Sequence, residues 1–294
     1  MYSYVDIHSH LNDKRFSSDL PKTLARMLEA GVASIVVGTD KAMSGRAIAL
    51  AVQHPDLWAT IGQHPTDNHT ENFDDTWYLE HAKHPRVVAI GECGLDYYWP
   101  EVRNRQRSDL KAVSPRSDLG ISAITDFEKE KRRQHELFER QMELAAAADK
   151  PLMIHGRPTK GTMDAYEDLL HILKNGQKHH GETIRGNIHF FVGNKEIAKQ
   201  FFDIGFTMSF TGVLTFTHDY DEVVRYISLQ SIMTETDAPY VAPVPYRGKR
   251  NEPAFVREVV KVIASIREED EETVRVALFA NTCRVFGLSE KVVN

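Results

Sequence analysis

Residues 4–10 of the chain read Tyr-Val-Asp-Ile-His-Ser-His. The apolar and β-compatible residues at the start of this stretch predict a strand, in which side chains two positions apart point the same way. His8 and His10 would then share one face and lie close enough to bind a metal ion, with Asp6 one step deeper to orient an imidazole. Two unrelated surface histidines would give the same pattern, so the interpretation depends on where other ligand-type residues fall.

The composition is that of an ordinary globular protein. The chain has 294 residues, of which 41% are hydrophobic, enough for one barrel-sized domain or two smaller ones. We expect no membrane span and no secretory signal, because the sequence contains neither a long apolar run nor a basic segment followed by an apolar one. Only two cysteines, Cys93 and Cys283, are present, which indicates a reducing compartment and hence a cytoplasmic location. The net charge of −6 argues against a surface that binds phosphate all over, but leaves room for a local positive patch.

Short apolar runs alternate with helical patterns along the rest of the chain. Regular alternation predicts parallel strands, and eight such units in this length predict a (β/α)8 TIM barrel that forms a single domain over residues 1–294. A doubly wound open sheet is the alternative, but no glycine-rich phosphate loop follows the first strand. Asn251 is the expected cap of the helix that follows the eighth strand. The predicted strands are 4–10, 33–38, 57–61, 87–90, 152–154, 184–188, 206–210 and 231–234, and the predicted helices are 21–30, 42–53, 74–83, 128–148, 162–174, 195–203, 220–228, 253–266 and 271–280.

One segment, residues 99–127, interrupts the alternation after the fourth strand. It is polar, and between residues 99 and 133 nine Lys or Arg residues stand against six Asp or Glu residues. A structureless run of this length within a compact domain is typical of a lid, a binding loop or a disordered segment. A solvated insertion without a role fits the pattern equally well.

Six residues of metal-ligand type stand at the ends of five predicted strands. In a TIM barrel all of them lie on the rim that carries the active site. Each has an ordinary structural explanation when taken alone, such as an ion pair or a turn cap, but six meeting at one rim by chance is not expected. Six ligands are too many for one tetrahedral zinc and suit two adjacent metal ions bridged by a carboxylate. They are His8, His10, Glu92, His155, His189 and Asp237.

Longer motifs resemble those of the TatD-type deoxyribonuclease family, a branch of the amidohydrolase-like barrels. They follow one another along nearly the whole chain, and ETDAPY and RGKRNEP are specific to the family. The resemblance implies a metal-dependent nuclease, in several members a 3'-5' exonuclease, that usually uses two divalent ions. The motifs are HSHL at 8–11, GQHP at 62–65, GECGLDY at 91–97, IHGR at 154–157, IHF at 188–190, ETDAPY at 235–240, RGKRNEP at 247–253 and NTCRVFGL at 281–288.

The resemblance also implies roles for the ligands. His8, His10 and Asp237 would hold one metal ion, His155 and His189 the second, and Glu92 would bridge the two. Asp237 would also accept a proton from the attacking water, so Asp237 and Glu92 are the expected catalytic residues. The four histidines favour zinc, whereas the two carboxylates also accept magnesium or manganese.

A phosphodiester at such a site needs its other phosphates and its bases held. Arginine and lysine residues that follow strands five and eight can grip phosphate, and aromatic residues beside the ligands can stack single-stranded bases. Core packing is the alternative for the aromatic residues, in particular for Phe191 and one tyrosine, and for His64, which ends the third strand. The predicted substrate contacts are His64, Arg157, Tyr97, Phe190, Tyr240, Arg247, Lys249 and Arg250.

Three features depart from the family pattern. The family commonly has serine where this chain has Gly156, and often a serine–glycine pair where this chain has Phe191 and Val192. The insertion at 99–127 is longer than in the family. These departures leave the metal ligands in place but concern the choice of substrate.

The first functional hypothesis is hydrolysis of DNA, at single-stranded ends in the 3'-5' direction, by a monomer that does not bind membranes. The second keeps the metal site and changes the bond, giving an amidohydrolase or esterase that acts on a small molecule or an aminoacyl ester, because one fold serves many chemistries. The third is a barrel that binds without catalysis, against which the complete ligand set argues.

Overall fold

The computed structural model describes residues 2–67, 71–98 and 119–288, with the side chains of 119–125 excepted. Eight parallel strands form one sheet in chain order, so the predicted TIM barrel is confirmed. The sheet closes between its first and last strands, where His10 N–H donates to Ala238 O at 2.7 Å and Asp237 N–H donates to His8 O at 2.9 Å. The strands are β1 (Tyr4–Ser9), β2 (Val32–Val36), β3 (Leu57–Ile61), β4 (Val87–Asp96), β5 (Leu152–Arg157), β6 (Gly186–His189), β7 (Thr207–Phe210) and β8 (Ile232–Thr234).

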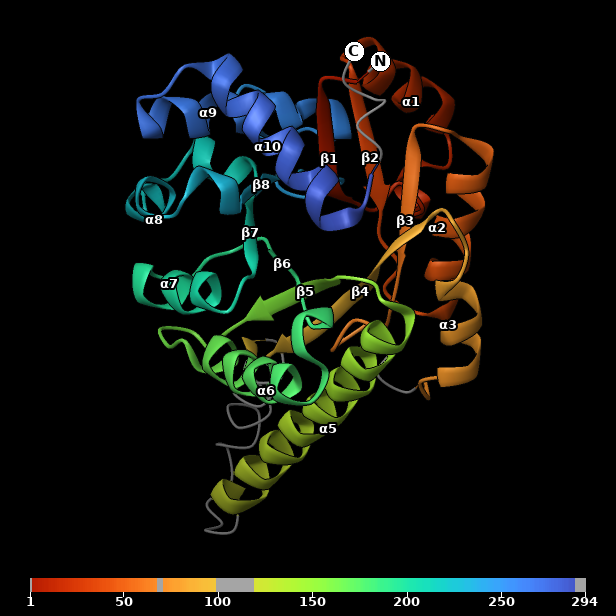
Figure 1. The fold of residues 1–294 in the computed structure, drawn as a ribbon, viewed down its shortest axis with the longest axis vertical. Helices are drawn as coiled ribbons and strands as arrows, with labels where there is room; N and C mark the ends of the chain where they lie inside the picture. Colours follow the sequence, from red (N-terminus) through yellow and green to blue (C-terminus); the bar gives the residue numbers. More distant parts are fainter. Residues whose placement is uncertain (1, 68–70, 99–118, 289–294) are drawn as a thin grey trace.

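Helices follow one another around the outside of the strands (Figure 1). Side chains that cap the free N–H groups of the first turn fix several of their starts. Asp40 accepts from Met43 N–H at the start of α2, and Asn194 accepts from Ile197 N–H at the start of α7. None of the described helices is long and apolar enough to cross a membrane. The helices are α1 (Leu20–Glu29), α2 (Lys41–Gln53), α3 (Asp75–Ala82), α5 (Leu119–Ala148), α6 (Asp164–His180), α7 (Lys195–Asp203), α8 (Asp221–Tyr226), α9 (Val256–Arg267) and α10 (Glu271–Phe286).

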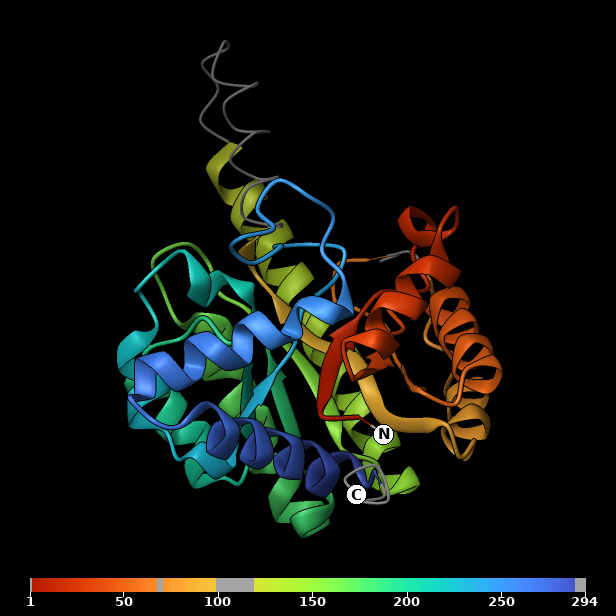
Figure 2. The ribbon, with the colours of Figure 1, turned by 90° about the horizontal axis from the view of Figure 1, so that it is seen from above.

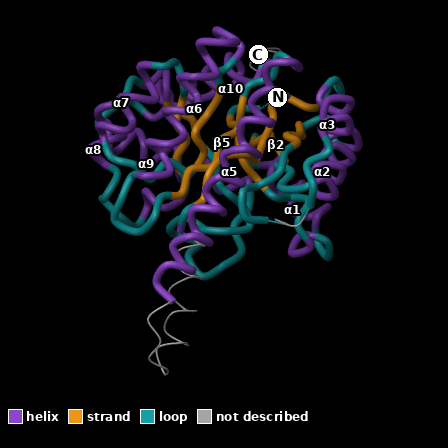
Figure 3. The backbone as a smooth tube through the Cα atoms, turned by 90° about the horizontal axis from the view of Figure 1, so that it is seen from below, coloured by secondary structure: helices purple, strands orange, loops and turns teal. Residues whose placement is uncertain are grey.

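Several predicted boundaries are wrong, among them the ends of α6 and α10, which run on to His180 and Phe286. Strand β4 runs on to Asp96 because it keeps pairing with β5 as far as Arg157. Helix α5 begins at Leu119 rather than at residue 128, and its N-terminal end projects beyond the other helices (Figure 3). The predicted insertion therefore falls mainly on residues 99–118, outside the described residues. Asn251 is not a helix cap: it is buried, and its amide donates to the carbonyls of Thr236 and Tyr240.

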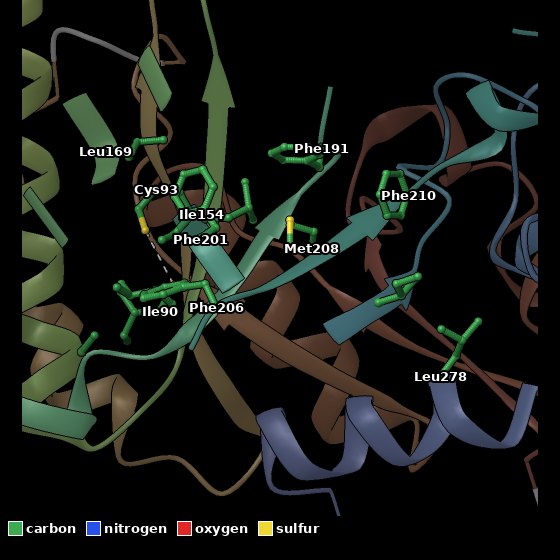
Figure 4. Packing of buried hydrophobic residues seen from close by; sticks show 14 of the residues in the cluster. Ile90, Cys93, Ile154, Leu169, Phe191, Phe201, Phe206, Met208, Phe210 and Leu278 are labelled. Atoms are coloured by element: carbon green, nitrogen blue, oxygen red, sulfur yellow. Dashed lines mark hydrogen bonds between the residues drawn. The ribbon is translucent and has the colours of Figure 1, made fainter. Parts of the chain in front are cut away.

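Apolar side chains fill the space between the strands and the surrounding helices, as for Ile154, Phe201 and Phe206 (Figure 4). A second cluster fills the barrel where its strands begin, and there Met153 and Met233 meet Phe279 of α10. Helices α9 and α10 lie side by side (Figure 2). Because α10 covers the end of the barrel where strands begin, the end where strands finish is left for the site.

Two strands carry an irregularity close to the predicted ligands. Strand β1 has one residue more than β2 between two of their pairs. Asp6 pairs with Ser34, and the next pair joins Ser9, three residues on, to Val36, two residues on. Strand β4 has the same irregularity between Ile90 and Cys93, which encloses Glu92. An extra residue of this kind turns the following side chains to a different face and is common beside active sites.

Candidate metal centre

Glu92 lies at the middle of the predicted ligand set, and its two oxygens face different pairs of histidines. Oε2 lies 3.4 Å from His8 Nε2 and 3.9 Å from His10 Nε2. Oε1 lies 3.0 Å from His155 Nδ1 and 2.9 Å from His189 Nε2. The carboxylate thus stands between two groups of nitrogen atoms.

Asp237 joins the group on the β1 side. Its Oδ1 lies 3.3 Å from His10 Nε2 and 3.8 Å from His8 Nε2. Its backbone has φ of +53°, a conformation that aspartate tolerates better than most residues. The structure therefore brings all six predicted ligands together.

Two buried carboxylates that the sequence analysis did not assign stand behind the histidines of the other group. Asp96 Oδ2 lies 3.2 Å from His155 Nε2, and Glu235 Oε1 lies 3.4 Å from His189 Nδ1. Glu235 also accepts from Phe190 N–H at 2.6 Å and from the Ser209 hydroxyl at 2.8 Å. Each carboxylate orients a ring whose other nitrogen faces Glu92. The two-residue alternation that linked His8 with His10 also links Glu235 with Asp237, and that signal was available in the sequence.

The prediction that Asp6 orients an imidazole is wrong. Its carboxylate accepts from the backbone N–H and the hydroxyl of Thr236, at 2.8 and 2.6 Å, and from the backbone N–H of His8 at 3.3 Å. The irregularity in β1 breaks the alternation between Asp6 and His8, so the carboxylate turns to β8 instead of to the ring. Asp6 therefore joins the first and last strands below the site.

The pKa values of Glu92 and Asp237 are both lowered, which favours their ionised forms. Burial alone would raise the pKa of Glu92, but the imidazoles of His189, His64 and His8 outweigh burial and hold the pKa well below its usual value. Burial likewise opposes ionisation of Asp237, and its contact with His10 outweighs it, so the pKa of Asp237 is lowered. Burial would lower the pKa of His155, but Asp96 and Glu92 raise it to about 9. A cation bound here would take the place of the proton on that ring.

The donor set fits a divalent cation. His8 Nε2 and His10 Nε2 lie 3.3 Å apart, and so do His155 Nδ1 and His189 Nε2. His8 Nδ1 is buried and has no hydrogen-bond partner among the described residues. Burial lowers the pKa of His8, so its ring stays neutral and keeps a lone pair. Imidazole nitrogens gathered around carboxylate oxygens are ligands of zinc and related ions.

His64 approaches the same centre and forms, with Glu92 and His155, a group that could hold a metal ion, but its hydrogen bonds favour a role as donor. Its Nδ1 accepts the backbone N–H groups of Thr66 and Asp67, each at 3.2 Å. Burial lowers the pKa of His64, so the ring is neutral and must carry its proton on Nε2. That nitrogen lies 3.6 Å from Glu92 Oε1. His64 therefore presents an N–H donor to the site.

The centre lines a cavity of about 620 Å³. Four of the predicted substrate contacts line it as well, namely His64, Arg157, Phe190 and Tyr240. Tyr240 has 46% of its surface exposed, and the guanidinium of Arg15 lies 4.2 Å from the centre of its ring. Among the described residues that line the cavity, five carboxylates stand against one guanidinium, that of Arg157: they are Asp13, Asp67, Glu92, Asp96 and Asp237.

Two predicted substrate contacts are wrong. Tyr97 is fully buried, and its hydroxyl lies 2.5 Å from His135 Nε2 and donates to Asp168 at 2.7 Å, so the ring cannot stack on a base. Arg250 donates to both oxygens of Asp19, each at 2.7 Å, and to Glu252 at 3.0 Å, so its guanidinium holds the loop after β8 on α1.

The other two basic residues of that loop do not line the cavity. Arg247 donates to the Ala242 carbonyl at 3.0 Å and lies over the ring of Phe216. Lys249 is exposed and approaches the Tyr246 ring. A phosphate-binding role for either residue stays a prediction.

Gly156 and Phe191, which both depart from the family pattern, lie against the same side chain, that of Tyr166. A Cβ atom at Gly156 would lie 2.5 Å from Tyr166 Cε1, so a side chain here would point at α6. Phe191 is buried, as the packing alternative predicted, with its ring 5.2 Å from that of Tyr166. The Tyr166 hydroxyl accepts from Val192 N–H. Both departures therefore change the packing between strands and helices.

A TIM barrel with clustered histidines and carboxylates at the finishing ends of its strands defines a metal-dependent hydrolase. A sequence model of the family described as TatD related DNase matches residues 5–287. The chain is 34% identical over 289 residues to the uncharacterized metal-dependent hydrolase YabD of Bacillus subtilis, covering 97% of this chain and 99% of that protein. It is 29% identical to the uncharacterized metal-dependent hydrolase YcfH of Escherichia coli, covering 97% of this chain and 96% of that protein. The crystal structure of YjjV, a TatD homolog from Escherichia coli K12, superposes with a TM-score of 0.79 at 25% identity, covering 98% and 99% of the two chains. The chain belongs to the TatD family of metal-dependent hydrolases.

Proposed function

We propose that this protein hydrolyses phosphodiester bonds of DNA at single-stranded ends, in the 3'-5' direction, with two divalent metal ions. The observation that carries the proposal is the position of Glu92, whose two oxygens face separate histidine pairs. His8, His10 and Asp237 would hold one ion, His155 and His189 the other, and Glu92 would bridge them. Two bound ions supply a polarised phosphate oxygen and a more acidic attacking water.

The charge of the cavity supports two ions. When bound cations replace the protons on its histidines, His155 included, its five carboxylates and one guanidinium give a formal charge of −4. A phosphate group would be repelled from such a cavity, and two divalent cations would cancel the charge. One divalent cation would leave the cavity negative.

The remaining steps belong to side chains of the chain. Asp237 lies at the cavity with an ionised carboxylate and would accept the proton of the attacking water. His64 would donate its Nε2–H to a phosphate oxygen, and Arg157 would pair with a neighbouring phosphate. Phe190 and Tyr240 would stack on bases.

The size of the cavity supports a strand end as substrate. A volume of about 620 Å³ falls within the range of pockets that enclose small ligands, roughly 300–1,000 Å³. A terminal nucleotide fits such a space, whereas a duplex does not.

The test is degradation of a 3'-labelled single-stranded oligonucleotide. The protein is stripped of metal and then supplied with magnesium, manganese or zinc, beside Glu92→Ala and Asp237→Asn. We expect cleavage that requires metal and Glu92, and an Asp237→Asn protein that folds but loses most turnover. Full activity of Asp237→Asn would refute its role as proton acceptor, and no cleavage by metal-loaded protein would refute the nuclease.

One observation favours a second candidate, an amidohydrolase or esterase acting on a small molecule or an aminoacyl ester. Arg250 is held by Asp19 and Glu252, and Arg247 and Lys249 do not line the cavity, so Arg157 is the one guanidinium among the described lining residues. Metal-dependent hydrolysis of such esters or amides, by protein that leaves DNA intact, would establish this reaction instead.

A further inference from the structure

Two glutamines of helix α5 form hydrogen bonds with the backbone at the ends of two neighbouring strands, β3 and β4. Gln134 accepts the backbone N–H of Asp96 at 2.8 Å and donates to the Asp96 carbonyl at 2.9 Å. Gln141 makes the same pair of bonds with Gln63, at 2.7 and 2.9 Å. Both glutamines are fully buried. Their spacing of seven residues is close to two helical turns, so both project from one face of α5.

Gln134 takes the place of a strand partner. Strand β3 ends at Ile61, whereas β4 continues beside β5 to Asp96. Tyr97 N–H donates to Arg157 O on the β5 side, so the N–H and C=O of Asp96 point to the opposite side, where β3 has already ended. Buried backbone groups need partners, and the Gln134 amide satisfies both of them. The helix thereby fixes the position of Asp96.

The strand ends that Gln134 and Gln141 bind lead to different side chains of the site. Beyond Gln134, the Asp96 carboxylate lies 3.2 Å from His155 Nε2, and Nδ1 of the same ring lies 3.0 Å from Glu92. Beyond Gln141, Gln63 is followed by His64, a hydrogen-bond donor outside the ligand set. The first path ends on a metal ligand, and the second does not.

We propose that Gln134 is a positioning residue for the His155–His189 side of the metal centre and acts through Asp96, whereas Gln141 positions only His64. The inference rests on the metal centre proposed above and is independent of the DNA substrate. It makes α5 the element that sets the affinity of one metal position from outside the barrel.

The experiment compares Gln134→Met with Gln141→Met in the full chain. Each substitution removes the same pair of hydrogen bonds to a strand end from an equally buried position on one helix; Gln134→Met also removes the bond that Gln134 donates to Glu130 at 3.0 Å. Calorimetric titration with zinc or manganese, and metal content after dialysis, measure binding without any substrate. We expect Gln134→Met to weaken the binding of one ion about 10- to 100-fold, as loss of a partner behind a ligand does. Gln141→Met should leave the affinity for both ions unchanged and lower only the turnover.

A double variant tests the path through Asp96. If Gln134 acts through this carboxylate, adding Gln134→Met to Asp96→Asn weakens metal binding no further. Additive losses would overturn the proposal, as would equal changes of metal affinity in the two glutamine variants. If Gln134→Met does not fold, Gln134→Asn and Gln141→Asn, which keep the amide and shorten its reach, are compared in the same way. Selective loss in the Gln134 variants of a protein that cleaves no DNA would support this proposal while refuting the nuclease.

Discussion

The two halves of the metal centre support their histidines in different ways. In the half formed by β5 and β6, a buried carboxylate stands behind each ring, Asp96 behind His155 and Glu235 behind His189. In the half formed by β1 and β8, no described carboxylate pairs with His8 Nδ1; this nitrogen, like His189 Nδ1, is buried without a hydrogen-bond partner among the described residues. Asp237, the carboxylate of that half, has 15% of its side chain exposed. Among the described residues, a carboxylate thus lies behind each ring of the β5–β6 half, whereas none pairs with the far nitrogen of His8 in the β1–β8 half.

The difference follows from how the strands contribute. The segment after strand β8 contributes a carboxylate to each half. Glu235 lies beside His189 Nδ1, and Asp237, two residues on, faces His10. Strand β1 supplies two rings, but its irregularity turns Asp6 away from them and toward Thr236. A carboxylate that could have oriented His8 instead joins two strands. The Asp6 carboxylate could either join β1 to β8 or orient His8, and in this structure it joins the two strands.

The largest effect is expected from Glu92→Gln, which acts on both halves at once. The amide keeps the shape of the side chain but removes the charge that both histidine pairs face. We expect turnover to fall at least ~10³-fold, the scale seen when an irreplaceable catalytic group is lost. Metal analysis should show weaker binding of both ions. Asp67→Asn is the control, since it removes a cavity carboxylate that pairs with His64 and with no other histidine among the described residues; equal loss of metal in that variant would contradict a bridging role for Glu92.

The second prediction contrasts two buried carboxylates at the joined strands. Glu235→Gln should weaken metal binding in the β5–β6 half about 10- to 100-fold, because the amide holds His189 less firmly. Asp6→Asn should instead lower the free energy of unfolding by about 1–3 kcal/mol, since its bonds to Thr236 are impaired. Calorimetric metal titration and urea unfolding separate the two effects. If Asp6→Asn reduced metal affinity as much as Glu235→Gln, the contrast between the halves would be wrong.

The third prediction concerns the order of metal removal. With two ions bound as proposed, a chelator should take the ion of the β1–β8 half first, because Glu92 faces one nitrogen of His8 but no described carboxylate pairs with the other. A tenfold difference in affinity between the halves corresponds to about 1.4 kcal/mol, and we expect at least that difference. Metal content followed over time should show two phases, with the fast phase missing in Asp237→Asn and the slow phase missing in His189→Ala. Loss of both ions in one phase would show that the halves are not independent.

The ligands could be predicted from the sequence because each of them lies in the second half of a strand or shortly after it. A strand end is a local pattern, and the topology of the barrel brings all such ends to one rim. Glu235 could have been found in the same way, from its alternation with Asp237. The irregularity of β1 could not, because it appears only in the register between Asp6 and Ser34.

The substrate contacts were less predictable because their partners lie far away in the sequence. Arg250 lies in the loop after β8, on the rim where a phosphate ligand is expected, but Asp19 holds it from 231 residues away. Tyr97 adjoins the site in sequence, yet its hydroxyl is bound by Asp168, 71 residues further on. The sequence gives the position of such a side chain on the rim, and only the packed helices decide which way it turns.

The smallest effect on the metal centre is expected from Gly156→Ser, which restores the residue common in the family. The new side chain would point at Tyr166 of α6, where its Cβ would lie 2.5 Å from the ring. We expect the free energy of unfolding to fall by about 1–3 kcal/mol through overpacking, with metal affinity unchanged in both halves. Gly45→Ser in α2 is the control, because a Cβ there meets no atom within 4 Å. A change of metal affinity in Gly156→Ser would mean that packing behind β5 reaches His155, and the β5–β6 half would then depend on the outer helices as well as on Asp96.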